Sequence, residues 1–176
     1  MPVPYFISFR TYGTWLHGSR EGSVDRDHNR LGRAFAPIDE RRAVRERELM
    51  RSEAVGLSPA ARVIVLLAIG GVCRHRGWAL YAIHVRTNHV HVVVGTSKNP
   101  ATPERALNDF KAWSTRRLVE AGLVTKGAPV WAYHGSTRYL NHEEGFAGAC
   151  HYTFHEQDGT RYDRESWREL WDGAAR

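Results

Sequence analysis

The chain has 176 residues, 42% of them hydrophobic, which excludes a small domain that depends on disulfide or metal staples for its core. Lysine and arginine number 25 against 19 aspartates and glutamates, a net charge of +6. This surplus favours polyanionic partners, nucleic acid before a membrane surface, although a merely basic soluble protein would also fit it.

The two cysteines, Cys73 and Cys150, lie far apart, and neither belongs to a C-x-x-C pair. We therefore expect reduced, buried thiols. The start of the chain lacks the basic residues and apolar core of a signal peptide. The most apolar segment, 63–72, is broken by two glycines and is too short to span a bilayer. We expect a cytoplasmic, nucleoid-associated protein with no membrane partner.

Hydrophobic periodicity and turn residues divide the chain into strands, helices and one long loop. In chain order, the predicted elements are a strand over 3–9, a loop over 17–37, a helix over 38–53, a helix from 58 to 76, strands over 78–86 and 88–96, a helix over 102–121, a strand over 129–140 and a helix over 141–157. Ser58-Pro59 and Thr102-Pro103 open two helices, and Asn141 is the expected N-cap of the last one.

This order of elements predicts an α+β fold of the ferredoxin-like (split βαβ) type. In that topology the first and third strands lie in the middle of an antiparallel sheet, and helices cover one face. We treat residues 1–176 as a single domain, in which an Arg- and Gly-rich loop and a charged helix form an insertion at about 17–57.

The third predicted strand carries two histidines within Asn-His-Val-His-Val-Val-Val, residues 88–94. Because side chains alternate along a strand, His89 and His91 share one face and the valines at 90, 92 and 94 share the other. The valines are expected beneath the helices and the histidines on the uncovered face. Two imidazoles about 7 Å apart along a strand can converge on a metal ion. A half-exposed strand that happens to carry two histidines is the alternative, and the spacing alone does not decide between them.

The last predicted helix has an aromatic residue on its polar side. Its predicted core stripe consists of Phe146, Cys150 and Phe154. Tyr152 lies roughly opposite this stripe, with Glu156 one turn later on the same face. Tyr152 is a candidate nucleophile and Glu156 a candidate metal ligand, with a surface tyrosine of no consequence as the alternative. Gln157 is a second candidate ligand, and His151 and His155 are lesser ones.

The segment Thr-Asn-His-Val-His-Val-Val-Val, residues 87–94, resembles the HUH signature of the single-tyrosine transposases of insertion sequences and of their chromosomal relatives, the REP-associated tyrosine transposases. The resemblance runs from about 78 to 157. The segment Pro-Tyr-Phe-Ile-Ser-Phe at 4–9 and Gly-Thr-Trp at 13–15 are similar to the REP-associated branch. The resemblance to this family implies a metal-dependent single-stranded DNA endonuclease and strand transferase. Such an enzyme acts at hairpin-flanked sites through a covalent 5′-phosphotyrosine.

The resemblance also implies roles for individual residues. Tyr152 would be the nucleophile, and His89 and His91 would bind a divalent metal, which we expect to be Mg²⁺ or Mn²⁺. The family pattern has an amide one turn beyond the tyrosine, where this chain has Glu156 with Gln157 next to it. The third ligand therefore stays open between these two residues.

Candidate DNA-binding residues are basic side chains near these elements. They are Lys111, Arg116, Arg117 and Arg138, with Arg20, Arg26, Arg30 and Arg33 of the long loop. Trp113 could stack on a base, but a place in the core beside Phe110 and Leu118 is the favoured interpretation. The expected partner is single-stranded DNA with hairpin structure, and a homodimer is also compatible with the sequence.

Two other functions also fit parts of the sequence. A domesticated, catalytically silent nucleic-acid-binding protein would keep the basic surface but would have no use for the histidines and the tyrosine. A His-x-His metallohydrolase with water as its nucleophile would need further ligands and would leave Tyr152 without a role.

Overall fold

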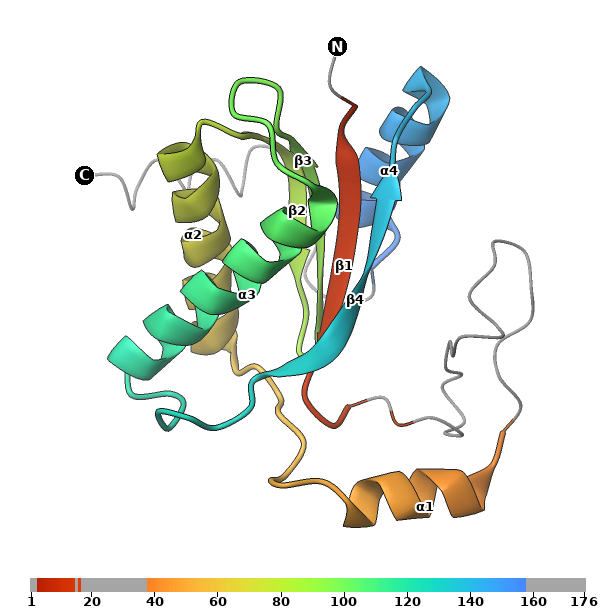
Figure 1. The fold of residues 1–176 in the computed structure, drawn as a ribbon, viewed down its shortest axis with the longest axis vertical. Coiled ribbons are helices and arrows are strands. Elements are labelled where there is room, and N and C mark those ends of the chain that lie inside the picture. Colours follow the sequence, from red (N-terminus) through yellow and green to blue (C-terminus); the bar gives the residue numbers. More distant parts are fainter. Residues whose placement is uncertain (1–2, 15, 17–37, 158–176) are drawn as a thin grey trace.

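The computed structural model describes residues 3–14, 16 and 38–157, which form four strands and four helices (Figure 1). In chain order these are β1 (Tyr5–Thr11), α1 (Glu40–Glu48), α2 (Pro59–Arg76), β2 (Ala79–Val85), β3 (His89–Gly95), α3 (Pro103–Glu120), β4 (Trp131–Tyr139) and α4 (Glu143–His155). Each predicted helix and strand is present within a few residues of its expected bounds. The predicted loop over 17–37, with its four arginines, lies outside the described residues.

The four strands form one antiparallel sheet in the order β2-β3-β1-β4. The first and third strands are therefore central, as the ferredoxin-like topology predicts, and the α+β class is confirmed. β2 and β4 are the edges of this sheet. In the central pair, Ser8 lies opposite His91 and Phe9 lies opposite Val90.

Helices α2 and α3 pack together on one face of the sheet and enclose the main core (Figure 1). Most strand residues that point toward them are apolar, and Ile7, Val90 and Val92 are fully buried. Phe110 of α3 is equally buried and meets Trp78 edge-on, with ring centroids 6.1 Å apart. The predicted alternation of the third strand is confirmed, because its valines fill the space beneath these two helices.

Helix α4 lies on the opposite face, the one that carries the histidines (Figure 1). Tyr152 meets Phe6 edge-on at 6.1 Å, and Phe146 meets Tyr81 at 4.9 Å. The expectation of an uncovered histidine face is therefore wrong. Contacts of α4 with β2 and β3 leave His91 only 8% exposed, so this face is a second packed layer rather than an open surface.

The helix caps follow the sequence signals at two of three positions. The side chains of Ser58 and Thr102 accept hydrogen bonds from backbone N–H groups three residues later, at 3.2 Å in both helices. Asn141 is not the N-cap of α4, contrary to prediction. Because the N–H of Leu140 still binds the carbonyl of Pro4, the helix begins later and His142 becomes its N-cap, without a side-chain cap bond.

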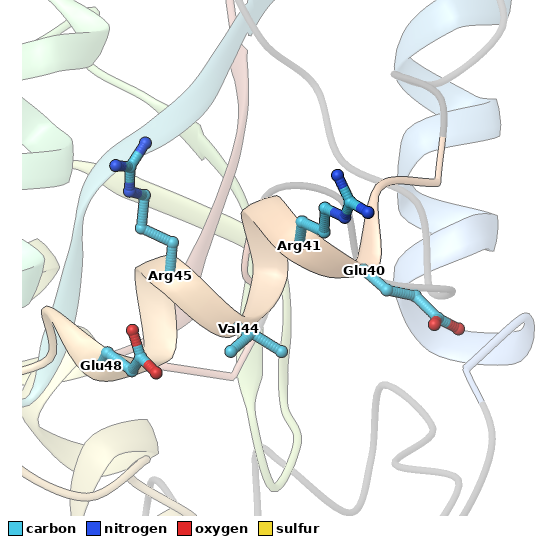
Figure 2. Close-up of a pocket in the computed structure, with 5 residues that line it drawn as sticks. All are labelled: Glu40, Arg41, Val44, Arg45 and Glu48. Carbon is cyan, nitrogen blue, oxygen red and sulfur yellow. The ribbon is translucent and has the colours of Figure 1, made fainter.

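Helix α1 belongs to the predicted insertion and has no buried residue, as expected of a surface helix. Five of its residues line a shallow pocket, and Figure 2 shows Arg41 and Arg45 projecting from the side of the helix away from Val44. Both cysteines are reduced thiols, with Cys73 buried and Cys150 half-buried. Within the described ranges, no helix is both long and apolar enough to cross a membrane.

Candidate histidine and tyrosine site

One face of the two central strands carries the candidate site. Register places Ser8 beside His91 and Arg10 beside His89, and Phe6 lies one step further along the same face. Sequence analysis assigned no role to these three residues of β1. The alternation of the strand could have placed them together on one face, but only its pairing with β3 brings them beside the histidines.

Both histidine rings are held by hydrogen bonds to their Nδ1 atoms. His89 Nδ1 donates to Asn88 Oδ1 at 2.7 Å, and His91 Nδ1 lies 2.7 Å from Ser8 Oγ. The ring centroids are 4.8 Å apart. Because Nδ1 is engaged in each ring, Nε2 is the atom with which each histidine could bind a metal. Fixing the ring through its other nitrogen is what metal-binding histidines need.

The environment keeps both imidazoles neutral at neutral pH. Burial, together with the nearby His89 and His84, lowers the pKa of His91 to about 3. Burial also lowers the pKa of His89, which a hydrogen bond with Gln157 partly offsets. A neutral imidazole has the lone pair that a metal ligand requires, so this state suits a metal site.

His84 is a third histidine at this site that sequence analysis missed. It lies opposite His91 in the pairing of β2 with β3 and is 2% exposed. A hydrogen bond joins it to the backbone of Thr153, so it connects the strands to α4. Burial is the main reason that the pKa of His84 falls to about 4.

The tyrosine helix brings Tyr152 next to the histidines of its own chain. The ring of Tyr152 meets His91 edge-on, with centroids 5.4 Å apart. The residue is 39% exposed, so its ring packs against the site while part of it remains open to solvent. Tyr152 was predicted on the polar side of the helix, and its ring contacts His91 from there.

Gln157 is the side chain from the end of α4 that reaches the histidines. Its Oε1 lies 3.4 Å from His89 Nε2, and its Nε2 donates to the carbonyl of Tyr152 at 3.3 Å. Two ligand atoms about 2.1 Å from one ion lie about 3.0 to 3.4 Å apart at octahedral or tetrahedral angles. The Gln157 and His89 acceptor atoms have the spacing that a shared divalent cation requires.

Glu156 points in another direction. Its Oε1 lies 3.2 Å from His151 Nδ1, and both side chains are more than half exposed. In the part of the chain that the structure describes, no group of three His, Cys, Asp or Glu residues is arranged to hold a metal. A three-residue site with His89 and His91 would therefore use the amide of Gln157.

Positive charge surrounds the histidines. Arg10 and Arg86 both act electrostatically on His89 and His91 and lower the pKa of each. Burial lowers the pKa of Arg10 itself to about 10. The guanidinium of Arg138 lies 5.9 Å from the centre of the Phe6 ring, on the same face. Of the candidate DNA-binding residues that the structure describes, Arg138 is the one that the fold brings to the histidine face.

The other described DNA-binding candidates lie elsewhere. Arg116 and Arg117 are exposed on α3, which covers the face opposite the histidines, and Arg117 pairs with Glu120 at 3.0 Å. Lys111 donates to three backbone carbonyls of β4. Trp113 is half-buried against the core and 5.4 Å from the ring of His75, in keeping with the favoured core interpretation.

The sequence matches no protein-family model and no curated protein. A solved structure shares the fold. It is described as the REP-associated tyrosine transposase bound to a REP hairpin. The superposition has a TM-score of 0.52 with 11% sequence identity and covers 87% of this chain and 65% of that one. The chain thus spans less than two thirds of the length of that protein.

At this identity the likeness is one of fold, and a fold can carry unrelated functions. The architecture implied by the HUH-like segment and the architecture of a REP-associated tyrosine transposase nevertheless agree. This agreement is independent of the motif, because a superposition compares backbone positions rather than the identity of His89, His91 or Tyr152.

Proposed function

We propose that the chain is a metal-dependent, single-stranded DNA endonuclease and strand transferase that acts through a covalent bond to Tyr152. The observation that carries the proposal is the convergence of side chains from β3 and from the end of α4. His89 and His91 of β3, Gln157 after α4 and the ring of Tyr152 meet on one face of the sheet. Such an arrangement combines a metal site with an adjacent nucleophile.

His89, His91 and Gln157 would hold Mg²⁺ or Mn²⁺ with two imidazoles and one amide oxygen. Three protein ligands leave positions for phosphate oxygens, and the bound ion would polarise the phosphorus and offset developing negative charge. Imidazole ligands favour Mn²⁺ over Mg²⁺, which prefers oxygen. Asn88 and Ser8 keep the two rings in the orientation that this site needs.

Tyr152 would attack the phosphorus through its hydroxyl oxygen. The bond from phosphorus to the 3′ oxygen breaks, which leaves a 5′-phosphotyrosine and a free 3′-hydroxyl. The proton lost by the tyrosine is balanced by the one that the departing 3′ oxygen gains, so no further reactant is needed. Because the new bond is again a phosphodiester, another 3′-hydroxyl can later attack it and rejoin the strand.

The arginines near the histidines would bind the DNA backbone. Arg10, Arg86 and Arg138 come from three parts of the sheet and surround the same face. Guanidinium groups hold phosphates through charge and paired hydrogen bonds. The solved structure of similar fold is described as bound to a REP hairpin, which supports hairpin-flanked single-stranded DNA as the substrate.

A labelled, hairpin-flanked single-stranded oligonucleotide, incubated with the protein and Mn²⁺ and run on a denaturing gel, tests the proposal. We expect a covalent protein–DNA adduct that disappears in Tyr152→Phe and persists in Tyr139→Phe. Tyr139 is a matched control because it is 53% exposed on the same sheet but packs against Tyr5, on the other face.

Each remaining outcome counts against one part of the proposal. An adduct that survives Tyr152→Phe would show that another tyrosine is the nucleophile. Cleavage without an adduct would indicate a metallohydrolase that uses water. Binding without cleavage would indicate a catalytically silent nucleic-acid-binding protein.

A further inference from the structure

The edge strand β4 departs from regular pairing near the histidine site. Phe9 of β1 pairs with Gly135 and Thr11 pairs with Trp131. One residue of β1, Arg10, therefore lies opposite three residues of β4, Ala132, Tyr133 and His134. Such an arrangement, with two extra residues on β4, is a special β-bulge, and bulges often re-aim side chains beside functional sites. We call residues 132–134 the β4 bulge.

Lys111 of α3 holds the bulge in place. Its Nζ donates to the carbonyls of Ala132, Tyr133 and His134 at 2.8, 3.2 and 3.2 Å. Successive carbonyls of a regular strand point to alternate sides, so three that converge on one ammonium group require an arched backbone. The arch is a built feature, because the ammonium group satisfies every carbonyl in it.

The end of the bulge depends on a glycine. A Cβ at Gly135 would lie 2.8 Å from the carbonyl oxygen of Ser8 and 2.9 Å from Leu107. Only a residue without a side chain allows β4 to approach β1 and α3 this closely. Gly135 and Lys111 together fix where the arch begins and how far it stands out from the sheet.

The arch pushes two rings into solvent. Tyr133 is 92% exposed, and its ring meets that of His134 edge-on with centroids 4.6 Å apart. A single exposed aromatic residue is ordinary on a protein surface. A pair on a backbone arch that half-buried Lys111 holds by three hydrogen bonds is a prepared aromatic surface.

This surface lies beside the candidate site. Arg10 is opposite His89 on one side and opposite the β4 bulge on the other. Two strand spacings of about 4.8 Å therefore separate the bulge backbone from that of His89, a span of about 10 Å. The β4 bulge, Arg10 and His89 therefore form one row across the sheet, and His91 lies two residues further along β3.

We propose that Tyr133 and His134 form a stacking platform for an unpaired base of single-stranded DNA, next to the phosphate that the histidine site receives. Charge favours single-stranded DNA as the ligand, because Arg10 and Arg86 make the neighbouring surface positive. The chain also carries a net charge of +6. Stacking rings beside cationic groups are what single-stranded nucleic acid binds. The position of the phosphate rests on the proposed function.

A single-stranded oligonucleotide with one 2-aminopurine, whose fluorescence falls on stacking, tests the platform without metal and without cleavage. Tyr133→Ala should weaken binding by about 5- to 150-fold and abolish the quenching. Tyr133→Phe keeps the ring and should bind like the native protein. Tyr139→Ala removes an exposed tyrosine from the other end of β4 and should leave both measurements unchanged.

Fully paired duplex DNA is the second arm of the experiment. Its bases are not available for stacking, so Tyr133→Ala should leave its affinity unchanged. Equal oligonucleotide binding by native protein and Tyr133→Ala would overturn the platform, as would an equal loss in Tyr133→Phe or for duplex. Because Tyr133 is almost fully exposed, its removal spares the core, and a thermal unfolding curve verifies this.

The two proposals can fail separately. A Tyr133-dependent quench without an adduct at Tyr152 would leave the platform standing and refute the nuclease. If an adduct forms at Tyr152 but Tyr133→Ala binds and quenches like the native protein, the nuclease proposal stands and the platform is refuted.

Discussion

The sheet face beneath α2 and α3 and the face beneath α4 are built from alternate residues of the same strands. On the first, Ile7 and Val92 lie side by side and are fully buried. On the second, Ser8 and His91 lie side by side and share a hydrogen bond. Both faces are covered by helices, yet one is an apolar core and the other a polar layer.

The difference lies in what burial requires of each face. Apolar side chains need only close packing, which contributes about 25 cal/mol for each Å² removed from water. A buried polar group needs a partner, since leaving it without one costs about 1 to 3 kcal/mol. The histidine face accordingly supplies Asn88, Ser8 and Gln157 as specific partners of its two imidazoles. The first face can hold the fold together while the second performs chemistry.

The largest expected effect separates the two faces by stability. Phe110→Ala, in the apolar core, should lower the free energy of unfolding by about 3 to 5 kcal/mol, because it leaves a cavity that the helices cannot close. Ser8→Ala, on the histidine face, leaves His91 Nδ1 without its partner and should cost about 1 to 3 kcal/mol. Urea unfolding measures both. Equal losses of unfolding free energy in the two variants would mean that the histidine face stabilises the fold as much as the apolar core does.

The next effect separates the two residues that compete as third ligand. Gln157→Ala should weaken Mn²⁺ binding by about 10- to 100-fold, because Gln157 Oε1 lies beside His89 Nε2. Glu156→Ala should leave the affinity unchanged, since its carboxylate contacts His151. Titration calorimetry with Mn²⁺ distinguishes them. A loss confined to Glu156→Ala would assign the site to the carboxylate and contradict the geometry described above.

A smaller effect links the apolar face to the β4 bulge. Lys111→Met should lower the free energy of unfolding by about 1 to 3 kcal/mol, because three carbonyls lose their donor. Exposed Lys98→Met is the matched control and should have no effect. A Lys111→Met protein as stable as the native one would show that the three hydrogen bonds from Lys111 do not stabilise the β4 bulge.

The same lysine predicts a pH dependence. Burial lowers the pKa of Lys111 to about 8 in the folded protein, below the ordinary value of 10.5. Between these values the unfolded chain binds more protons, so the native protein gains stability from this group as pH rises. The stability difference between native protein and Lys111→Met should therefore be larger at about pH 9.5 than at about pH 7.5. Urea unfolding at the two pH values measures it, and a smaller difference at the higher pH would refute the sign.

The smallest effect concerns the thiols of the two faces. Cys73 is 2% exposed beneath the apolar face, and burial raises its pKa to about 12, so it should resist thiol reagents until the protein unfolds. Cys150 of α4 is only half-buried and should react first. Spectrophotometric thiol titration of native protein and Cys73→Ser follows both. Rapid reaction of two thiols in the folded protein would contradict this order.

Much of the fold was predictable because its signals are local. The period-2 alternation of His89 to Val94 identified a strand with two distinct faces, and Ser58 and Thr102 identified helix starts through their own side-chain bonds. Asn141 was misleading, because the pairing of Leu140 with Pro4 carries the chain past it. An N-cap residue type indicates where a helix could start. Here the hydrogen bond between Leu140 and distant Pro4 determined where α4 does start.

The sequence by itself determined which residue types are available at the site: two histidines on one strand face, and a tyrosine followed by a glutamate and a glutamine. Only the tertiary structure decided how they combine. It placed α4 over the histidines, turned Gln157 toward His89 and Glu156 toward His151, and set Arg10 between the histidines and the β4 bulge. The physical reason is that alternation within a strand is a local property of the backbone. Register between strands and the direction of a helix-terminal side chain depend on contacts between residues far apart in sequence.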